Sequence, residues 1–115
     1  MQLFTWESVS KEVMHEKLWR KVIFGEKATV AQLFLAKDCV VPVHQHESEQ
    51  FSYVIKGALK FELEGMEVIA RSGDVLLIPS NVPHKVVALE DTLDIDIFSP
   101  VRQDWQTGRD DYLRK

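Results

Sequence analysis

The sequence HQHESEQFSYVIKG occupies residues 44–57. Its two histidines, His44 and His46, are two positions apart, so in an extended strand both imidazoles project from one face and reach a common ion. Gln50 follows with the same even parity, and Gly57 comes seven positions later as a turn residue. The stretch therefore predicts a strand that carries metal ligands on one face.

Two carboxylates in this stretch compete with Gln50 as the fourth ligand. Glu47 and Glu49 both lie nearby, and a carboxylate is the better ligand for a hard cation. In a continuous strand their odd parity points them away from His44 and His46, although a turn in this segment would remove that argument. Gln50 is therefore the favoured ligand, and Glu49 stays as the alternative.

A second stretch, GDVLLIPSNVPH, occupies residues 73–84 and adds a third histidine, His84. Gly73 and Pro79 bracket a short apolar run that is typical of a strand between two turns. Asn81 tolerates the left-handed backbone conformation that a tight turn requires. The two stretches together predict a site built on His44, His46, Gln50 and His84.

The four histidines of the chain do not carry equal weight. Three of them fall in the two stretches, whereas His15 stands alone and is assigned to the surface or to a hydrogen bond within the fold. Imidazole is a ligand for Zn, Ni, Fe, Mn and Cu, so the sequence predicts one divalent metal ion without naming it.

Composition and length indicate one ordinary globular domain over residues 1–115, with 45% hydrophobic and 28% charged residues. Its barrel core is expected at about 28–98, between N-terminal strands in 1–27 and a polar tail, 99–115. Apolar alternation between turn residues predicts strands at 17–24, 28–36, 50–56, 58–64, 66–71, 75–79, 84–89 and 92–98. Near the N-terminus no more than one short helical turn is expected. In the tail, Trp105, Tyr112 and Leu113 are expected to dock a short irregular or helical segment.

Charge and hydropathy exclude several partners. A net charge of −4 and the lack of basic runs argue against nucleic acid. No stretch is long and apolar enough to span a membrane and the N-terminus lacks the pattern of a signal peptide, so the cytoplasm is expected. The lone Cys39 is expected to be a buried apolar residue. Exposed edge strands favour a homodimer through the N-terminal strands.

The two stretches resemble the paired motifs of the cupin superfamily. The first motif is His, any residue, His, three or four residues, Glu, six residues, Gly, and it is matched by His44, His46, Gln50 and Gly57. The second is Gly, five residues, Pro, any residue, Gly, two residues, His, and it is matched by Gly73, Pro79, Asn81 and His84. The departures are Gln50 for Glu and Asn81 for Gly. The resemblance implies an all-β cupin barrel, a double-stranded β-helix or jelly roll, that binds a metal ion.

Gln50 bears on the chemistry of such a site. Three neutral imidazoles and a neutral amide leave the full charge of a divalent ion uncompensated, so the ion attracts anions and acts as a Lewis acid. A carboxylate ligand would instead help to stabilise a higher oxidation state. The ligand set therefore disfavours oxygen activation.

The last predicted strand, 92–98, alternates acids with aliphatics. The alternation alone predicts that the aliphatic residues Leu93, Ile95 and Ile97 face the core. It predicts that Asp94 and Asp96 face water. A strand whose outer side is covered by other strands or by a second subunit would reverse this arrangement. The pattern favours the first alternative.

A narrower resemblance favours the second. Small single-domain cupins of pectin and alginate breakdown, which linearise unsaturated monouronates, share the three-His, one-Gln ligand set. They also place an Asp, a Phe two residues later and an Arg four residues beyond that at the site, which correspond to Asp96, Phe98 and Arg102. The resemblance implies that Asp96 transfers a proton, Phe98 packs on the sugar ring and Arg102 binds a carboxylate.

The resulting hypothesis is a metal-dependent enzyme that converts ring-closed unsaturated monouronates to open-chain keto-uronates, with a small anionic sugar acid as its substrate. Two alternatives stay open. A metal-dependent cupin dioxygenase would require iron and consume oxygen. A non-catalytic cupin would bind a sugar or a metal without turnover.

Overall fold

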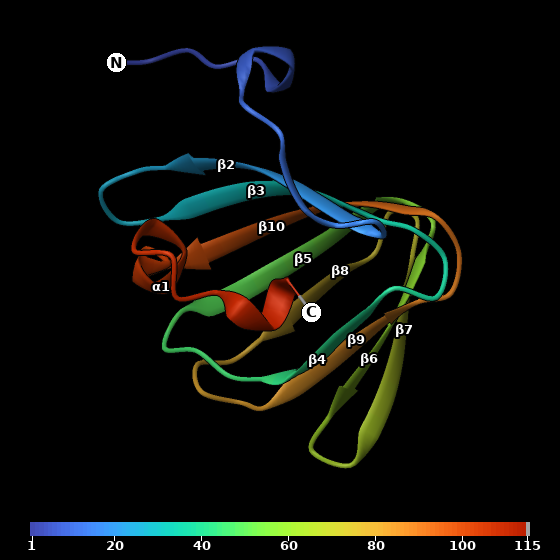
Figure 1. Cartoon of the computed structure of the whole chain (residues 1–115). Helices are drawn as coiled ribbons and strands as arrows, with labels where there is room; N and C mark the ends of the chain where they lie inside the picture. Colours follow the sequence, from blue (N-terminus) through green and yellow to red (C-terminus); the bar gives the residue numbers. More distant parts are fainter. Residues whose placement is uncertain (115) are drawn as a thin grey trace.

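The computed structural model describes residues 1–114, in which ten strands form two antiparallel sheets (Figure 1). The larger sheet has the order β1 (Glu12–His15), β2 (Leu18–Phe24), β3 (Thr29–Leu35), β10 (Thr92–Ser99), β5 (Glu49–Lys56) and β8 (Val75–Ile78). The smaller sheet has the order β4 (Val40–His44), β9 (His84–Ala88), β6 (Ala58–Leu63) and β7 (Met66–Arg71). This arrangement confirms the predicted all-β class.

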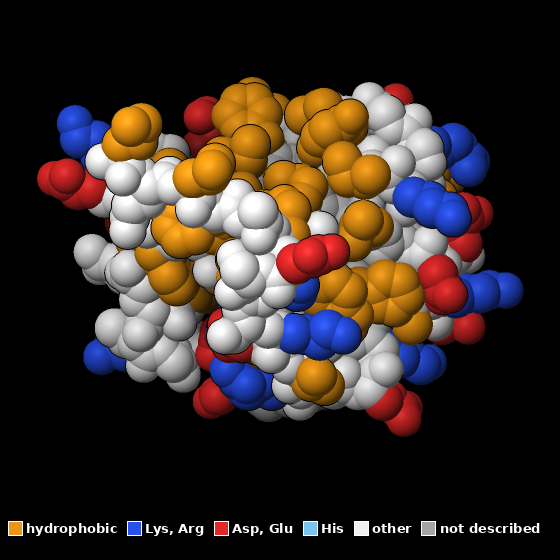
Figure 2. All heavy atoms as spheres, turned by 90° about the horizontal axis from the view of Figure 1, so that it is seen from above, with side chains coloured by type: hydrophobic (Ala, Val, Ile, Leu, Met, Phe, Trp, Pro, Cys, Tyr) orange, Lys and Arg blue, Asp and Glu red, His pale blue; other side chains and the backbone are white. Residues whose placement is uncertain are grey.

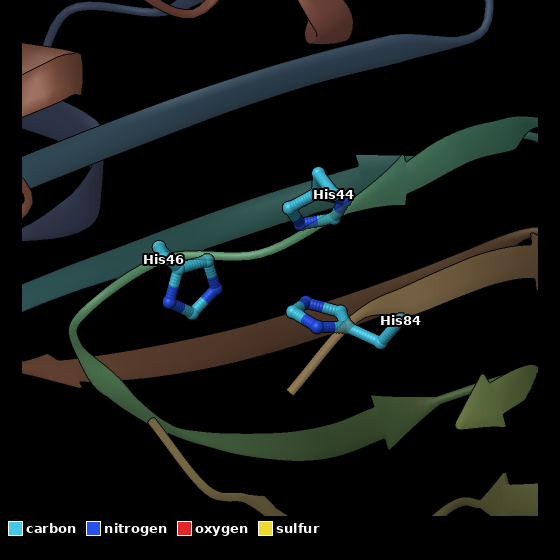
Figure 3. Close-up of side chains that lie close together, drawn as sticks. All are labelled: His44, His46 and His84. Carbon is cyan, nitrogen blue, oxygen red and sulfur yellow. The ribbon is translucent and has the colours of Figure 1, made fainter. Parts of the chain in front are cut away.

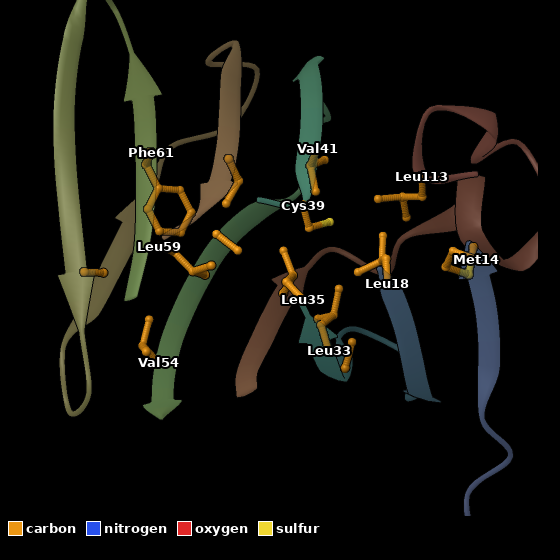
Figure 4. Close-up of a cluster of buried hydrophobic side chains, with 14 of the residues drawn as sticks. Met14, Leu18, Leu33, Leu35, Cys39, Val41, Val54, Leu59, Phe61 and Leu113 are labelled. Carbon is orange, nitrogen blue, oxygen red and sulfur yellow. The ribbon is translucent and has the colours of Figure 1, made fainter. Parts of the chain in front are cut away.

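The core lies between the two sheets. The inward residues of β3, Ala31, Leu33 and Leu35, pack with Leu59 and Phe61 of β6 and with other buried apolar side chains (Figure 4). Strict alternation along β3, where every second residue is buried, produces this inner face. Cys39 is buried in the same cluster, as predicted, and burial raises the pKa of its thiol to about 11.

Two strands were missed by the sequence patterns. β4 is a short run with mixed burial, and β1 pairs only with β2 at one edge of the larger sheet. β1 lies at an edge, and its apolar residue Val13 is 66% exposed. Apolar and polar residues therefore do not alternate along β1 in the way that would predict a strand. Near the N-terminus the helical structure is limited to one 3-10 turn, Trp6–Ser8, which agrees with the expectation of no more than one short turn.

The expectation from pattern alone, that the aliphatics of β10 face inward, is wrong, and the reverse arrangement favoured by the narrower resemblance is the one observed. Asp94 and Asp96 are buried between the sheets, whereas Leu93 and Ile95 are only partly buried and Ile97 is exposed on the outer side. β10 is a central strand, paired with β3 on one side and β5 on the other, so its polar side chains line the interior.

The C-terminal segment folds back over the barrel. It contains α1 (Gln103–Gln106) and a 3-10 turn, η2 (Asp111–Leu113). Trp105 and Leu113 are buried and Tyr112 packs against the core cluster, which confirms the predicted docking. Arg20 of β2 supports this segment through its ion pair with the buried Asp110.

Gly57 and Asn81 both adopt the positive φ angles expected of them as turn residues. Gly57 has a φ of 110°, and a Cβ there would overlap Thr92 and the carbonyl of Asp91. Asn81 has a φ of 61°, so it supplies the left-handed turn expected of it.

The outer surface carries many apolar side chains. Figure 2, which looks onto the molecule from above, shows hydrophobic side chains spread over much of that side. On the outer side of the larger sheet the exposed ones are Phe51, Tyr53 and Ile55 of β5, Val75 and Leu77 of β8, and Ile97 of β10. Within residues 1–114, no helix has the length and apolar character needed to cross a membrane.

Candidate metal centre

The structure brings His44, His46 and His84 together at one end of the barrel (Figure 3). His44 ends β4 and His84 begins β9, and the two are cross-strand partners in that ladder. His46 lies just beyond β4, in the loop that leads to β5. One nitrogen from each ring lies within 4.8 Å of one from each of the others, so the three could hold a metal ion.

Backbone carbonyls orient all three imidazoles in the same way. Each Nδ1 lies 2.8–2.9 Å from a carbonyl oxygen two residues away, on Pro42 for His44, Ser48 for His46 and Val82 for His84. Because a carbonyl only accepts, each Nδ1 carries the ring hydrogen and each Nε2 keeps its lone pair. This orientation is typical of metal-binding histidines.

The surroundings keep these rings neutral. Burial, with the neighbouring His84 as the next cause, lowers the pKa of His44 to about 3. Burial and the nearby Arg102 charge lower the pKa of His46 to about 4, and burial also lowers the pKa of His84. Neutral imidazole is the form that binds metals, so the site is ready for a cation at neutral pH.

Gln50 lies beside the histidines and is only 5% exposed, whereas Glu47 and Glu49 are exposed. The chain bends between β4 and β5, so the parity argument fails here. The side chain of Gln50 faces inward because alternate residues of β5 line the barrel interior.

Two observations indicate that a cation fits this site. The Gln50 Oε1 and the His46 Nε2 are 3.0 Å apart, although both atoms are acceptors once His46 Nδ1 carries the hydrogen. A shared cation relieves this repulsion, since two ligands each about 2.1 Å from one ion lie roughly 3 Å apart. Within residues 1–114, the buried His84 Nε2 has no hydrogen-bond partner, as expected of a metal ligand.

A polar chain leads from this site to Asp96. The Gln50 Nε2 donates to Ser52 Oγ over 2.8 Å, and Ser52 Oγ donates to Asp96 Oδ1 over 2.7 Å. Asp96 is 8% exposed, and burial raises its pKa even though the Ser52 hydrogen bond acts in the opposite direction. Burial and the nearby Asp96 charge raise the pKa of Asp94 well above its ordinary value.

Arg102 and Phe98 form the other side of the site. The Phe98 ring packs edge-on against His46, and the Arg102 guanidinium lies 4.7 Å above the same ring. The Nε and Nη2 atoms of Arg102 donate to the two carboxylate oxygens of Asp104, over 2.9 and 2.6 Å. Asp104 therefore already occupies one edge of the guanidinium that the sequence assigned to substrate.

Tyr112 is a site residue whose position the sequence did not predict. Its ring stacks on His44 at 4.5 Å, and its hydroxyl accepts from Arg102 Nη2 over 2.6 Å and from Trp105 Nε1 over 3.2 Å. The sequence indicated only that this residue docks, because nothing in its spacing relates it to the histidines. Ser52 and Asp94 were also missed, although both share the parity of a predicted site residue on the same strand.

These residues line a cavity that opens to the surface. Polar groups line one part of it, namely His44, His84, Gln50, Ser52, Asp94, Asp96 and Arg102, and apolar residues such as Leu35, Leu59 and Phe61 line the rest. His46 and Arg102 also border an outer hollow of about 780 Å³, so they lie between the interior and the surface.

Comparison with known proteins agrees with the fold. Residues 32–99 match the family model described as the Cupin domain. The uncharacterized protein MJ1618 of Methanocaldococcus jannaschii is 25% identical over 80 residues, which are 69% of this chain and 61% of that protein. The match thus spans less than two-thirds of this curated relative.

Solved structures give a fuller match. KdgF from a Halomonas species is 32% identical, with a TM-score of 0.83 over 90% of this chain and 99% of that one. An RmlC-like cupin from Shewanella frigidimarina is 26% identical, with a TM-score of 0.84 over 91% and 96%. A Bacillus subtilis oxalate decarboxylase is similar only in fold, at 18% identity over 86% of this chain and 29% of that one, with a TM-score of 0.76. The neighbours thus include an enzyme, and the chain belongs to the cupin family as a small jelly-roll cupin that resembles KdgF.

Proposed function

We propose that this protein is a metal-dependent enzyme that converts ring-closed unsaturated monouronates, derived from pectin or alginate, into open-chain keto-uronates. One observation carries the proposal: Gln50, Asp96 and Arg102 line the same cavity as His44 and His84. This group of residues is the one implied by the resemblance to uronate-linearising cupins. The overall likeness to KdgF, at 32% identity, also supports it.

The reaction is an isomerisation, so it requires no oxidant, reductant or second substrate. The hemiacetal hydroxyl of the sugar loses its proton while the ring C–O bond breaks, which leaves an aldehyde and an enolate. A proton added to the neighbouring carbon then converts the enolate to a ketone. One group that accepts and returns a proton is therefore enough, together with groups that stabilise negative charge.

The bound metal ion would be held by His44, His46, His84 and Gln50 and would supply Lewis-acid stabilisation of the negative charge that develops on oxygen. Its identity among Zn, Ni, Fe, Mn and Cu is left open by this donor set.

Arg102 is proposed to bind the substrate carboxylate through the edge of its guanidinium that Asp104 leaves free. Asp104 bonds to Nε and Nη2, so Nη1 and the second Nη2 hydrogen form the edge available to a ligand. The Tyr112 hydroxyl accepts a hydrogen bond from Nη2 of Arg102. A substrate carboxylate that binds this edge has to displace it. Phe98, whose face is covered by Arg102, then has the further task of holding the guanidinium in place.

Asp96 is proposed to move the proton. Its burial and raised pKa bring it closer to neutrality than an exposed carboxyl, which suits a group that both takes and returns a proton. Asp96 lines only the inner cavity, whereas Arg102 also borders the outer hollow, so a carboxylate held by Arg102 would direct the rest of the ring toward Asp96.

The test uses monouronates released by a pectin or alginate lyase. Metal-loaded protein should accelerate loss of the ultraviolet absorbance of the conjugated monouronate, and Asp96→Asn should slow this by roughly 10²- to 10⁴-fold. Asp91→Asn, at an exposed position before β10, serves as the matched control and should keep full activity.

Two results would contradict the proposal. Oxygen uptake with iron-loaded protein would point to a cupin dioxygenase, and tight sugar binding without turnover would point to a non-catalytic cupin. Equal rates for the wild type and Asp96→Asn would remove Asp96 from the reaction.

A further inference from the structure

Ser52 links the candidate metal ligand Gln50 to Asp96, and the link has a direction. The Gln50 Nε2 can only donate and a carboxylate oxygen of Asp96 can only accept, so the serine hydroxyl accepts from one and donates to the other. The Gln50 Oε1 is thereby turned toward His46. Each of the three side chains fixes the orientation of the next.

The strands hold this chain in place. Ser52 follows Gln50 by two residues on β5, so both face inward, and Ser52 is the cross-strand partner of Asp96 on β10. Ser52 is 1% exposed, which shields its hydroxyl from competing water. Because both strands are central in the larger sheet, the three side chains have little freedom to rearrange.

We propose that Ser52 is a positioning residue that, together with the amide of Gln50, orients both the fourth metal ligand and the proton-transferring carboxylate. The hydrogen-bonded chain from Gln50 through Ser52 to Asp96, called the relay below, also accounts for glutamine rather than glutamate at position 50. This inference rests on the proposed function for the role of Asp96, but its metal-binding part stands without it.

Glutamine and glutamate differ at this position in the hydrogen-bond donors that their side chains offer. An amide offers an oxygen to a cation and, at the same time, an N–H to Ser52, whereas a carboxylate offers acceptors only. With glutamate at position 50, the single Ser52 hydrogen would be shared between two carboxylates, and Asp96 would lose its fixed donor. Gln50 is therefore suited to join the ion to Asp96 in a way that glutamate cannot.

The first experiment measures zinc binding by competition with a chelating dye, without any substrate. Ser52→Ala removes the acceptor that holds the Gln50 amide, so zinc affinity should fall on the order of tenfold, as is typical for partners of metal ligands. Ser52→Thr keeps the hydroxyl and should restore the affinity. Ser10→Ala, at an exposed serine just before β1 and far along the chain from the site, is the control for the substitution itself.

The second experiment measures turnover of the unsaturated monouronate at saturating zinc. Ser52→Ala should lower kcat roughly 10- to 100-fold with little change in KM, because Asp96 is misoriented while Arg102 is untouched. Ser52→Thr should recover most of the loss. In a Gln50→Glu background, where the relay is already broken, Ser52→Ala should have almost no further effect on kcat.

The outcomes separate the two proposals. Wild-type zinc affinity in a folded Ser52→Ala, or unchanged kcat in an active enzyme, would overturn the relay. If the wild type binds zinc but never turns over the uronate, a fall in zinc affinity in Ser52→Ala still supports the relay while the proposed function fails. If Ser52→Ala does not fold, Gln50→Glu takes its place, because it removes the N–H that donates to Ser52, and an unchanged kcat in Gln50→Glu would overturn the relay.

Discussion

Replacing Tyr112 by phenylalanine removes one oxygen from the mouth of the site and leaves the ring stacked on His44. In the wild type that oxygen accepts from the charged Arg102 Nη2 over 2.6 Å and from Trp105 Nε1 over 3.2 Å. A hydrogen bond from a charged donor contributes about 1.5–3 kcal/mol and a neutral one about 1 kcal/mol. Tyr112 is only partly buried, so we expect a loss of about 2 kcal/mol in the free energy of unfolding.

The same change should favour substrate binding. A carboxylate that takes the open edge of Arg102 has to displace the Tyr112 hydroxyl from Nη2, and the phenylalanine variant no longer requires this displacement. If about 1–1.4 kcal/mol is recovered, KM falls roughly five- to tenfold. Stability and substrate affinity are therefore expected to change in opposite directions.

Thermal unfolding followed by circular dichroism and steady-state kinetics on the monouronate check both effects. For a chain of this size, 2 kcal/mol corresponds to a Tm lower by about 8 °C. Tyr53→Phe is the control, because Tyr53 is an exposed tyrosine on the outer side of the larger sheet. A raised KM with an unchanged Tm would refute the reasoning, since it would mean that the hydroxyl binds substrate and does not compete with it.

Further predictions concern the metal, pH and association. His84→Ala should abolish zinc binding in the chelator assay, because it removes a buried ligand atom with no other partner in residues 1–114. The pKa values of His44 and His46, about 3 and 4, lie below that of an unfolded histidine, so the metal-free protein should lose stability from about pH 6.5 toward pH 4 in urea titrations. Because the pKa of Asp94 is raised in the folded state, proton uptake by Asp94 stabilises the protein as the pH falls. Asp94→Asn removes this contribution, so its free energy of unfolding should fall more steeply with decreasing pH. β1 is an edge strand with the apolar Val13 exposed, which predicts a homodimer through the N-terminal strands, and sedimentation should show more monomer for Val13→Lys.

Much of the metal centre could be predicted from local spacing. His44 and His46 lie near each other whatever the details of the strand end, and His84 follows a turn whose geometry Asn81 signals. Gln50 was placed correctly beside them, but for a reason that does not hold. The chain bends before β5, and the inward face of β5 in the larger sheet is what brings Gln50 into the site.

Other parts of the site depend on contacts between distant segments, which local patterns do not encode. Tyr112 reaches His44 only because the C-terminal segment folds back over the barrel, held by Trp105 and by the ion pair of Arg20 with Asp110. The pairing of Asp104 with Arg102 is local, since the two are only two residues apart, but it depends on α1, whose four residues have no helical pattern strong enough to predict it. These contacts decide which edge of Arg102 is free.

The burial of the acids in β10 shows why pattern alone placed them wrongly and what their placement implies. Alternation identifies the two faces of a strand but does not say which face is buried when both sides can be covered. Burying Asp94 and Asp96 opposes stability, since each carboxyl loses water and their charges repel. A stripe of polar groups, Gln50 and Ser52 on β5 and Asp96 on β10, nevertheless crosses the interior next to the histidines. Disagreements between pattern and structure are expected at functional sites, so the one at β10 supports the proposed function.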